Sequence, residues 1–234
     1  MTAPRQPAGS AARGIVRAGE ADIGVLSQVI ADAFFPLAPC QWLICDEAAR
    51  REIFPGYFRM YVEHAMADGL VDTTPGRDAA ALWIPLGPQL PEPPDGYDEH
   101  LAQITGPWVE RFVVFDAELD DHHLTGVEHH HLAILAVRPD RQGHGIGTAL
   151  LDARHAVLDE EGMTAYLEAS DEHTRGIYLR HGYMDYGSPI QLPASSFAHG
   201  DDGAPGQRAD GPRMYPMVRR PKSHTPSELA DGPT

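Results

Sequence analysis

Three alternating glycines near the middle of the chain could bring bare backbone close to a ligand. Gly143, Gly145 and Gly147 stand in the stretch RQGHGIGT, between an apolar run and a helical pattern. Glycine lets backbone N–H groups approach a ligand closely, and the N–H groups at a helix start are unpaired and attract anions. The spacing therefore predicts a site for a phosphate or pyrophosphate group, in preference to an ordinary strand-to-helix turn.

A second group of reactive side chains is the run EHHH at residues 128–131, which could bind a metal ion together with His122 and His123. Adjacent histidines on a strand point to opposite faces, which makes a site of three histidines awkward. The run has no cysteine nearby and the chain has no His-Glu-x-x-His pattern, two common signatures of zinc sites. We therefore expect no metal.

A dinucleotide-binding loop is the main alternative for the glycines. Such a loop has the pattern Gly-x-Gly-x-x-Gly directly after a strand, with an acidic residue about 20 positions further on. Glu168 lies near that position, but Thr148 stands where the third glycine belongs. Residues 138–142 separate the apolar run from the first glycine, and little chain remains for the second half of such a fold. These departures favour a different anion site.

Two segments resemble motifs of the GNAT superfamily of N-acetyltransferases. VRPDRQGHGIGTALL resembles its acetyl-CoA-binding motif, whose core Gln/Arg-x-x-Gly-x-Gly/Ala falls on Gln142, Gly145 and Gly147. YLEASDEHTRGIYLRHGY resembles the next family segment, in which a tyrosine, here Tyr178, precedes an Arg-x-Gly-aromatic ending. The resemblance is strongest over residues 130–184 and extends over residues 15–219. Within the superfamily, the sequence is most similar to the puromycin N-acetyltransferase-like branch.

The resemblance implies a mixed α/β fold with an α+β-like character. It predicts one domain at residues 13–220, between tails at 1–12 and 221–234, with a twisted mixed sheet, a splayed strand pair and helices on both faces. It implies an acetyl-CoA-dependent N-acetyltransferase, with acetyl-CoA as co-substrate. The residues expected to hold it are Leu135, Ala136, Val137, Arg141, Gln142, Gly143, His144, Gly145, Ile146, Gly147, Thr148, Thr174 and Tyr178. Thr174 stands where many relatives carry an asparagine.

The resemblance also implies two catalytic roles. Tyr178 would be the general acid for the leaving thiolate, because a phenol with a pKa of about 10 is protonated at pH 7. Relatives often place a carboxylate before the central strand, so we expect Glu128, which stands there, to be the general base. His130 and His131 titrate near neutrality and remain alternatives, although strand alternation prevents both from facing one cleft. Attack by the amine would be direct.

Composition narrows the partner and the location. The formal net charge is -16 and the only lysine is Lys222. Clustered Lys and Arg are needed to bind phosphate backbones, so we expect neither nucleic acid nor an anionic membrane as a partner. The acidic residues Asp116, Glu118, Asp120 and Asp121 could attract a cationic substrate. No apolar run approaches the ~20 residues of a membrane span and no signal-peptide core is visible, which predicts a cytoplasmic protein.

The favoured function is therefore acetylation of a small-molecule amine, such as a metabolite or an antibiotic-like compound. The alternatives are an amine of a protein or peptide, a non-catalytic acyl-CoA-binding sensor, and a nicotinamide-dependent enzyme. The sequence leaves open the acceptor, the acyl-chain preference and the choice between monomer and homodimer.

Hydrophobic periodicity predicts the elements that must position these residues. We expect helices at residues 20–35, 46–67, 97–121, 145–162 and 170–181, the second interrupted or kinked at Pro55 and the last capped by Ser170. The expected strands lie within residues 14–19, 69–74, 79–87, 129–137, 164–170, 183–192 and 213–220, the second and third forming a hairpin. The glycines thus follow the central strand and open the fourth helix.

Overall fold

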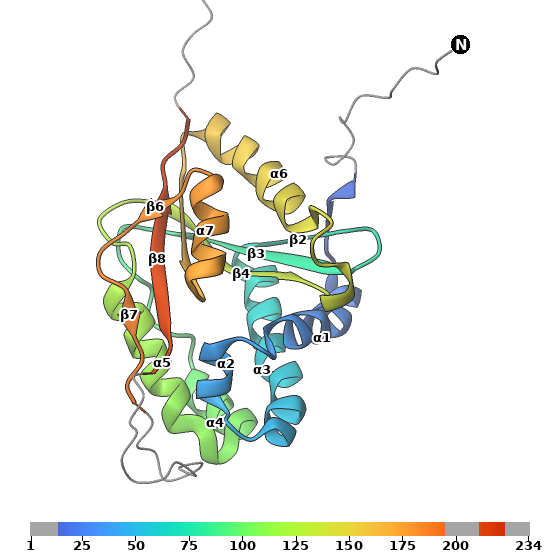
Figure 1. The fold of residues 1–234 in the computed structure, drawn as a ribbon, viewed down its shortest axis with the longest axis vertical. Coiled ribbons are helices and arrows are strands. Elements are labelled where there is room, and N and C mark those ends of the chain that lie inside the picture. Colours follow the sequence, from blue (N-terminus) through green and yellow to red (C-terminus); the bar gives the residue numbers. More distant parts are fainter. Residues whose placement is uncertain (1–13, 195–210, 223–234) are drawn as a thin grey trace, which may run out of the picture.

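A mixed sheet with helices on both faces forms the molecule in the computed structural model, which describes residues 14–194 and 211–222 (Figure 1). Its strands are β1 (Val16–Arg17), β2 (Leu70–Thr73), β3 (Ala79–Leu86), β4 (His129–Val137), β5 (Thr164–Ala169), β6 (Met184–Asp185), β7 (Ile190–Gln191) and β8 (Arg213–Arg219). Their order is β1-β2-β3-β4-β5-β8-β6, with β7 paired to β8. The predicted tails, 1–12 and 221–234 apart from residues 221 and 222, lie outside the described residues.

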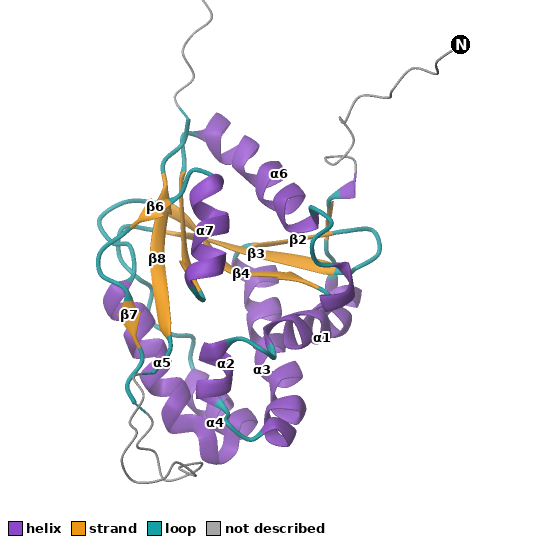
Figure 2. Cartoon of the chain, in the orientation of Figure 1, coloured by secondary structure: helices purple, strands orange, loops and turns teal. Residues whose placement is uncertain are grey.

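Helices cover the two faces of the sheet unequally, as Figure 2 shows. They are α1 (Ile23–Phe34), α2 (Ala38–Leu43), α3 (Glu47–Asp68), α4 (Tyr97–Thr105), α5 (Val109–His122), α6 (Ile146–Glu161) and α7 (Glu172–Arg180). Side chains of α1 to α5 share one apolar core with the sheet, and those of α6 and α7 share the other. None of the helices in the described ranges has the length and apolar character needed to cross a membrane.

The central strand β4 is buried on both faces, which explains its nearly continuous apolar sequence. Ile134 and Ala136 pack in the core beneath α1 to α5, whereas Leu132 packs on the side of α6. β4 runs antiparallel to β3 and parallel to β5. The sheet is therefore mixed, as predicted, and differs from the parallel, doubly wound sheet that a dinucleotide-binding fold requires.

β4 and β5 separate soon after they meet. They pair only from His129 opposite Thr164 to His131 opposite Tyr166. On the other side, the register with β3 shifts at Leu82 and Trp83, which pair with Ile134 and Leu132 and leave Ala133 as an extra residue. Such a bulge bends a strand and increases its twist. The splayed strand pair that the sequence implied is thus present, with a bulge at the point of separation.

The structure differs from the sequence-based elements in five places, one of which is that the strand expected at residues 183–192 is divided into β6 and β7. The helix expected at 97–121 is broken into α4 and α5, because Gly106 has a φ of 54° and Pro107 has no N–H to continue the helix. α2 was not predicted. α3 continues through Pro55 as one helix. Asp171, rather than Ser170, caps α7, since its side chain accepts a hydrogen bond from the Thr174 N–H.

Gly69, between α3 and β2, offers a direct test of this packing. An added Cβ would collide with the backbone carbonyl group of Trp83, whereas at Gly87 it would meet nothing within 4 Å. Backbone cannot move aside cheaply, so we expect Gly69→Ala to lower the free energy of unfolding by about 1–3 kcal/mol or more. Gly87→Ala, the control, should stay within about 0.5 kcal/mol. Thermal and urea unfolding measure both; equal stabilities of the two variants would contradict the packing described.

Candidate active site

A cleft of about 670 Å³ opens where β4 leaves β5. Its walls come from β4, the glycine segment, α6 and α7 on one side, and from α1, α2, α3 and α5 on the other. Every residue that the sequence predicted for the co-substrate lines this cleft, except His144. The structure therefore brings together a strand, a loop and a helix that are separated along the chain.

The start of α6 has the backbone geometry of an anion-binding site. Gly143 and Gly145 have positive φ values of 76° and 78°, and Gly145 is the N-cap of α6 without a side-chain cap. The N–H groups of the first turn therefore have no partner within the helix. A Cβ at either glycine would meet no protein atom within 4 Å, so the space beside this backbone is open. The loop fits a phosphate or pyrophosphate group.

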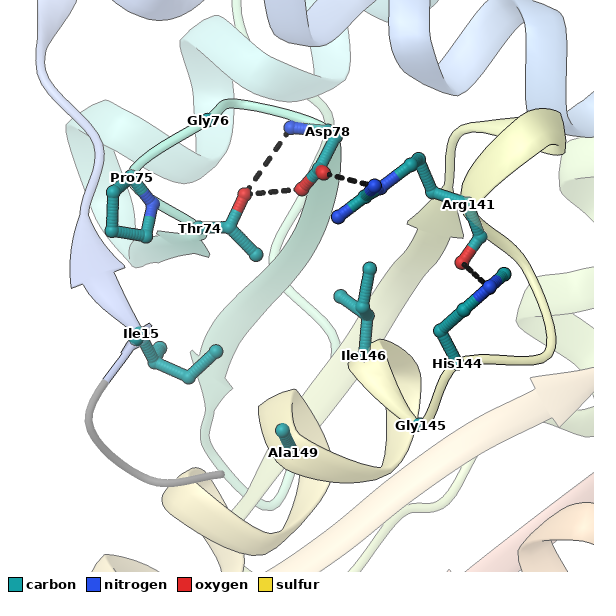
Figure 3. A pocket seen from close by; sticks show the side chains of 11 residues that line it. Ile15, Thr74, Pro75, Gly76, Asp78, Arg141, His144, Gly145, Ile146 and Ala149 are labelled. Carbon is teal, nitrogen blue, oxygen red and sulfur yellow. Dashed lines mark hydrogen bonds and ion pairs between the residues drawn. The ribbon is translucent and has the colours of Figure 1, made fainter. Parts of the chain in front are cut away.

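Side chains next to the glycines hold the loop in place. Gln142 donates from Nε2 to the carbonyl oxygen of Val137 at 3.0 Å, which fastens the loop to the end of β4. Figure 3 shows a smaller pocket of about 380 Å³ behind the loop, where Arg141 Nε lies 3.1 Å from Asp78 Oδ2. His144 Nδ1 lies 2.7 Å from the carbonyl oxygen of Gln142, so its ring stays against the loop itself. The Asp78 carboxylate makes this second pocket less suitable for an anion.

Tyr178 reaches the cleft from α7. Its ring packs against Tyr183 with centroids 5.6 Å apart. Burial raises the pKa of Tyr178, and the nearby Asp171 raises it further. The phenol is therefore protonated at neutral pH. Within the described part of the chain its hydroxyl has no hydrogen-bond partner, which leaves it available to a bound molecule.

Thr174 also lines the cleft, but its hydroxyl is already engaged at the start of α7. Oγ1 accepts from the Asp171 N–H at 3.1 Å and lies 2.9 Å from Asp171 Oδ1 and 3.3 Å from Ser170 Oγ. These contacts form a capping box with Asp171. Thr174 therefore shapes the helix end that faces the co-substrate site.

The three base candidates from the sequence lie in different environments. Glu128 is exposed just before β4 and does not belong to the cleft lining. His130 faces α6, where it accepts a hydrogen bond from Arg154 Nη2 at 3.1 Å, and burial followed by the Arg154 charge lowers its pKa. His131 alone of the three lines the cleft. The predicted opposite orientation of His130 and His131 is confirmed.

His131 is paired with a buried carboxylate that the sequence did not identify as a site residue. Its Nε2 lies 2.9 Å from Glu168 Oε2, and the side chain of Glu168 is only 7% exposed. Burial raises the pKa of Glu168, but His131 and His123 lower it more, so the net pKa lies well below its usual range. The sequence did offer one signal for Glu168: it is the single acidic residue of an otherwise apolar strand, and a buried charge needs a partner.

The pair continues into a row of histidines beside α5. His123 Nδ1 lies 3.5 Å from Glu168 Oε1, and His123 Nε2 lies 3.1 Å from His129 Nε2. Burial lowers the pKa of His129 to about 4, so this ring is neutral at pH 7. The row closes at the carbonyl oxygen of Val127, 3.0 Å from His129 Nδ1.

Within residues 14–194 and 211–222, two groups of side chains come close enough to hold a metal ion. They are His123, His131 and Glu168, and, outside the cleft, Asp152, His155 and His181, with potential ligand atoms within 4.8 Å of one another. In each group a donor is already engaged: His131 pairs with Glu168, and His155 Nε2 lies 3.0 Å from the Tyr183 hydroxyl. These contacts account for the residues without an ion.

The acidic stretch of α5 does not line the cleft. Asp116 instead accepts a hydrogen bond from the Tyr97 hydroxyl at 2.9 Å, and burial raises its pKa to about 6. The residues that α5 contributes to the cleft are Phe115 and Leu119. The cation-attracting wall expected from Asp116, Glu118, Asp120 and Asp121 is thus replaced by an apolar one.

We call the part of the cleft lined by α1, α2, α3 and α5 the acceptor chamber. Its apolar side chains include Phe34, Leu37, Leu43, Phe58, Phe115 and Leu119. Cys40 also lines it, but burial raises the pKa of this thiol to about 12. Since the thiolate is the nucleophilic form, Cys40 is unsuited to carry a covalent acyl group.

Comparison with known proteins agrees with this geometry. Residues 108–185 match the family model described as "Acetyltransferase (GNAT) domain". No curated protein matches the chain. A solved structure from Corynebacterium glutamicum, described as histone acetyltransferase HPA2 and related acetyltransferase, is similar with a TM-score of 0.60 and 20% identity, covering 91% of this chain and 98% of that one.

Two further solved structures have the same fold, and their names state two different acceptors. Arylalkylamine N-acetyltransferase 2 from Aedes aegypti has a TM-score of 0.54 and 10% identity, covering 88% of this chain and 97% of that one. A variant of agmatine N-acetyltransferase in its apo form has a TM-score of 0.52 and 16% identity, covering 88% and 99%. The shared fold therefore does not select the acceptor.

The glycine cradle can be tested with two matched glycines of α6. Gly145 and Gly162, at its opposite ends, both have positive φ and open space at the Cβ position, but only Gly145 lines the cleft. Both Glu substitutions strain the backbone by about 1–2 kcal/mol. Acetyl-CoA should raise the melting temperature of the wild type and of Gly162→Glu. Gly145→Glu should abolish that rise, because its carboxylate fills the cradle. An undiminished rise would refute the anion site.

Proposed function

Because residues 108–185 match a GNAT acetyltransferase domain model, we propose that the chain is an acetyl-CoA-dependent N-acetyltransferase that acetylates the amine of a small molecule by direct attack. The supporting observation is the meeting, in one cleft, of an anion-binding helix start, an unpaired strand edge and the His131–Glu168 pair. Each part corresponds to a need of the reaction: a bound donor, a positioned carbonyl and a proton acceptor.

We propose that the glycine segment and β4 hold the co-substrate. Acetyl-CoA supplies an acetyl group as a thioester, whose carbonyl carbon an amine can attack. The N–H groups at residues 143–148 would bind its pyrophosphate, and the main chain of Leu135 to Val137 would bind its extended arm. Beyond His131 this side of β4 has no strand partner in the described residues, so its backbone groups are available for hydrogen bonds. One such N–H would stabilise negative charge on the carbonyl oxygen.

His131 is the general base in this proposal, in place of Glu128. A carboxylate only accepts hydrogen bonds, so His131 Nε2 must donate to Glu168, which leaves Nδ1 to take up a proton. The negative Glu168 then stabilises the imidazolium that forms and fixes the ring orientation. Tyr178, with its unpartnered and protonated hydroxyl, donates a proton from Oη to the leaving sulfur.

A small molecule is favoured over a protein acceptor by the acceptor chamber. Its walls are apolar side chains of four helices, whereas a peptide backbone would bring amide groups that need hydrogen-bond partners.

Tyr178→Phe tests the acid while keeping the ring. If Oη supplies the proton, kcat should fall ~10²-fold or more with little change in the acetyl-CoA-induced rise in melting temperature. Tyr186→Phe is the control, because Tyr186 lies outside the cleft lining. Free thiol release measures the rate. A near-normal kcat for Tyr178→Phe would assign proton donation to another group or to water.

His131→Gln and Glu128→Gln distinguish the two base candidates. Removal of the base should change how kcat/KM depends on pH, because only the deprotonated base accepts the proton. His131→Gln should lower kcat/KM ~10²-fold or more at pH 7 and recover partly at high pH, where the free amine becomes abundant. Glu128→Gln should keep the wild-type profile. The opposite outcome would restore Glu128 as the base and reduce His131 to a lining residue.

A further inference from the structure

We propose that the acceptor is a primary amine carried on one aromatic ring or an apolar body of similar size, without a carboxylate and without a second cation. This inference rests on the proposed function and specifies its substrate class. It comes from the side chains that the acceptor chamber presents, since solved structures of the same fold carry the names of chemically different acceptors.

The chamber offers one site for a single positive charge. Among the described lining residues that its helices contribute, none is charged. His131 and Glu168 supply the ionisable groups at its inner end, and the only contact of Glu168 Oε1 with the described residues is the long one of 3.5 Å to His123 Nδ1. A buried carboxylate oxygen in this state favours a nearby ammonium group. The acceptor's amine is thus drawn to the pair that removes its proton.

Other charges on the acceptor would lack partners. The arginines of the cleft lining, Arg141 and Arg180, belong to the glycine segment and α7, on the co-substrate side. Asp171 also lies on that side and caps α7. Moving an unpaired charge from water into an apolar chamber is costly. A carboxylate would also be repelled by Glu168, and a second ammonium would find no second carboxylate.

The wall opposite β4 is a chain of aromatic rings in edge contact. Phe34 and Phe58 have centroids 5.2 Å apart, as do Phe58 and Tyr57, and Tyr57 and Tyr61. The Tyr57 and Tyr61 hydroxyls lie 3.0 Å from each other, so one of them donates a hydrogen bond to the other. Aromatic pairs in such edge-to-face and tilted geometries attract beyond their buried area. This wall therefore favours an acceptor that adds a further ring.

The reaction on such an acceptor balances without any other reactant. The ammonium loses one proton to His131 Nδ1, the free nitrogen forms a bond to the acetyl carbon, and the carbon–sulfur bond breaks. The leaving sulfur gains a proton from Tyr178 Oη, the second nitrogen proton restores the Tyr178 hydroxyl through solvent, and His131 releases its proton to solvent. The products are the N-acetyl amine, free CoA thiol and one released proton.

A panel of amines tests the substrate class with the wild-type protein and acetyl-CoA. It contains 2-phenylethylamine, phenylalanine, 1,4-diaminobutane and a short peptide with a free N-terminus and one lysine. We expect kcat/KM for 2-phenylethylamine to exceed that for each of the others by ~100-fold or more, because only it enters without an unpaired charge. Free thiol release and mass detection of the acetylated amine provide the measurement.

A charge introduced into the chamber should weaken the discrimination. Leu119 lines the chamber from α5, whereas Val113 on the same helix is 52% exposed and outside the cleft. Leu119→Arg should lower the ratio of kcat/KM for 2-phenylethylamine to that for phenylalanine at least ~10-fold, since the guanidinium can pair with a carboxylate. Val113→Arg should leave the ratio unchanged. If Leu119→Arg lacks the acetyl-CoA-induced rise in melting temperature, Phe34→Arg replaces it.

The outcomes of these experiments distinguish a failure of the substrate class from a failure of the proposed function. Preference for phenylalanine or diaminobutane would overturn the substrate class and leave small-molecule acetylation intact. Acetylation of the peptide alone would overturn the substrate class and the choice of a small molecule. Stabilisation by acetyl-CoA without thiol release from any amine would overturn the proposed function, and the inference with it. An unchanged ratio in the folded Leu119→Arg variant would show that the acceptor does not use the chamber.

Discussion

The parting of β4 from β5 is the constraint on which the site depends. The strands share hydrogen bonds only as far as His131 and Tyr166, so β4 continues with one edge unpaired. Buried backbone groups must find partners, and an extended ligand lying along this edge would supply them. The same wedge admits side chains from both strands: Glu168, two residues beyond the last pair, reaches back to His131. In the proposed function, binding and proton transfer thus share one structural cause.

The two faces of β4 separate the structural histidine from the one at the cleft. His130 turns toward α6 and meets Arg154, whereas His131 turns toward the acceptor chamber. A one-residue slip in the pairing would exchange them, because strand side chains alternate. The bulge at Ala133 lies two residues after His131 in the strand. It changes the direction of the side chains that follow, so that Ile134 and Ala136 pack in the core.

Patterns of neighbouring residues predicted the elements of the proposed co-substrate side, whereas contacts between residues far apart in the sequence could not be predicted. The glycine segment, the start of α6 and the position of Tyr178 follow from neighbouring residues in the sequence. The contact of His131 with Glu168 joins residues 37 positions apart and depends on the register of two parallel strands, which no local pattern reveals. Glu128 was chosen for its place before the strand, yet that place leaves it in solvent. The helix break at Gly106 could have been predicted from the sequence, because a Gly-Pro pair seldom continues a helix.

The family match begins at residue 108, beyond α1, α2 and α3. Those helices supply most of the acceptor chamber, and α6, α7 and the glycine segment supply the co-substrate side. The match thus covers the co-substrate side of the proposed site, and most of the acceptor chamber lies outside it. Under the proposed function, mutations among residues 23–68 would alter which amine is acetylated while the acetyl donor remains the same.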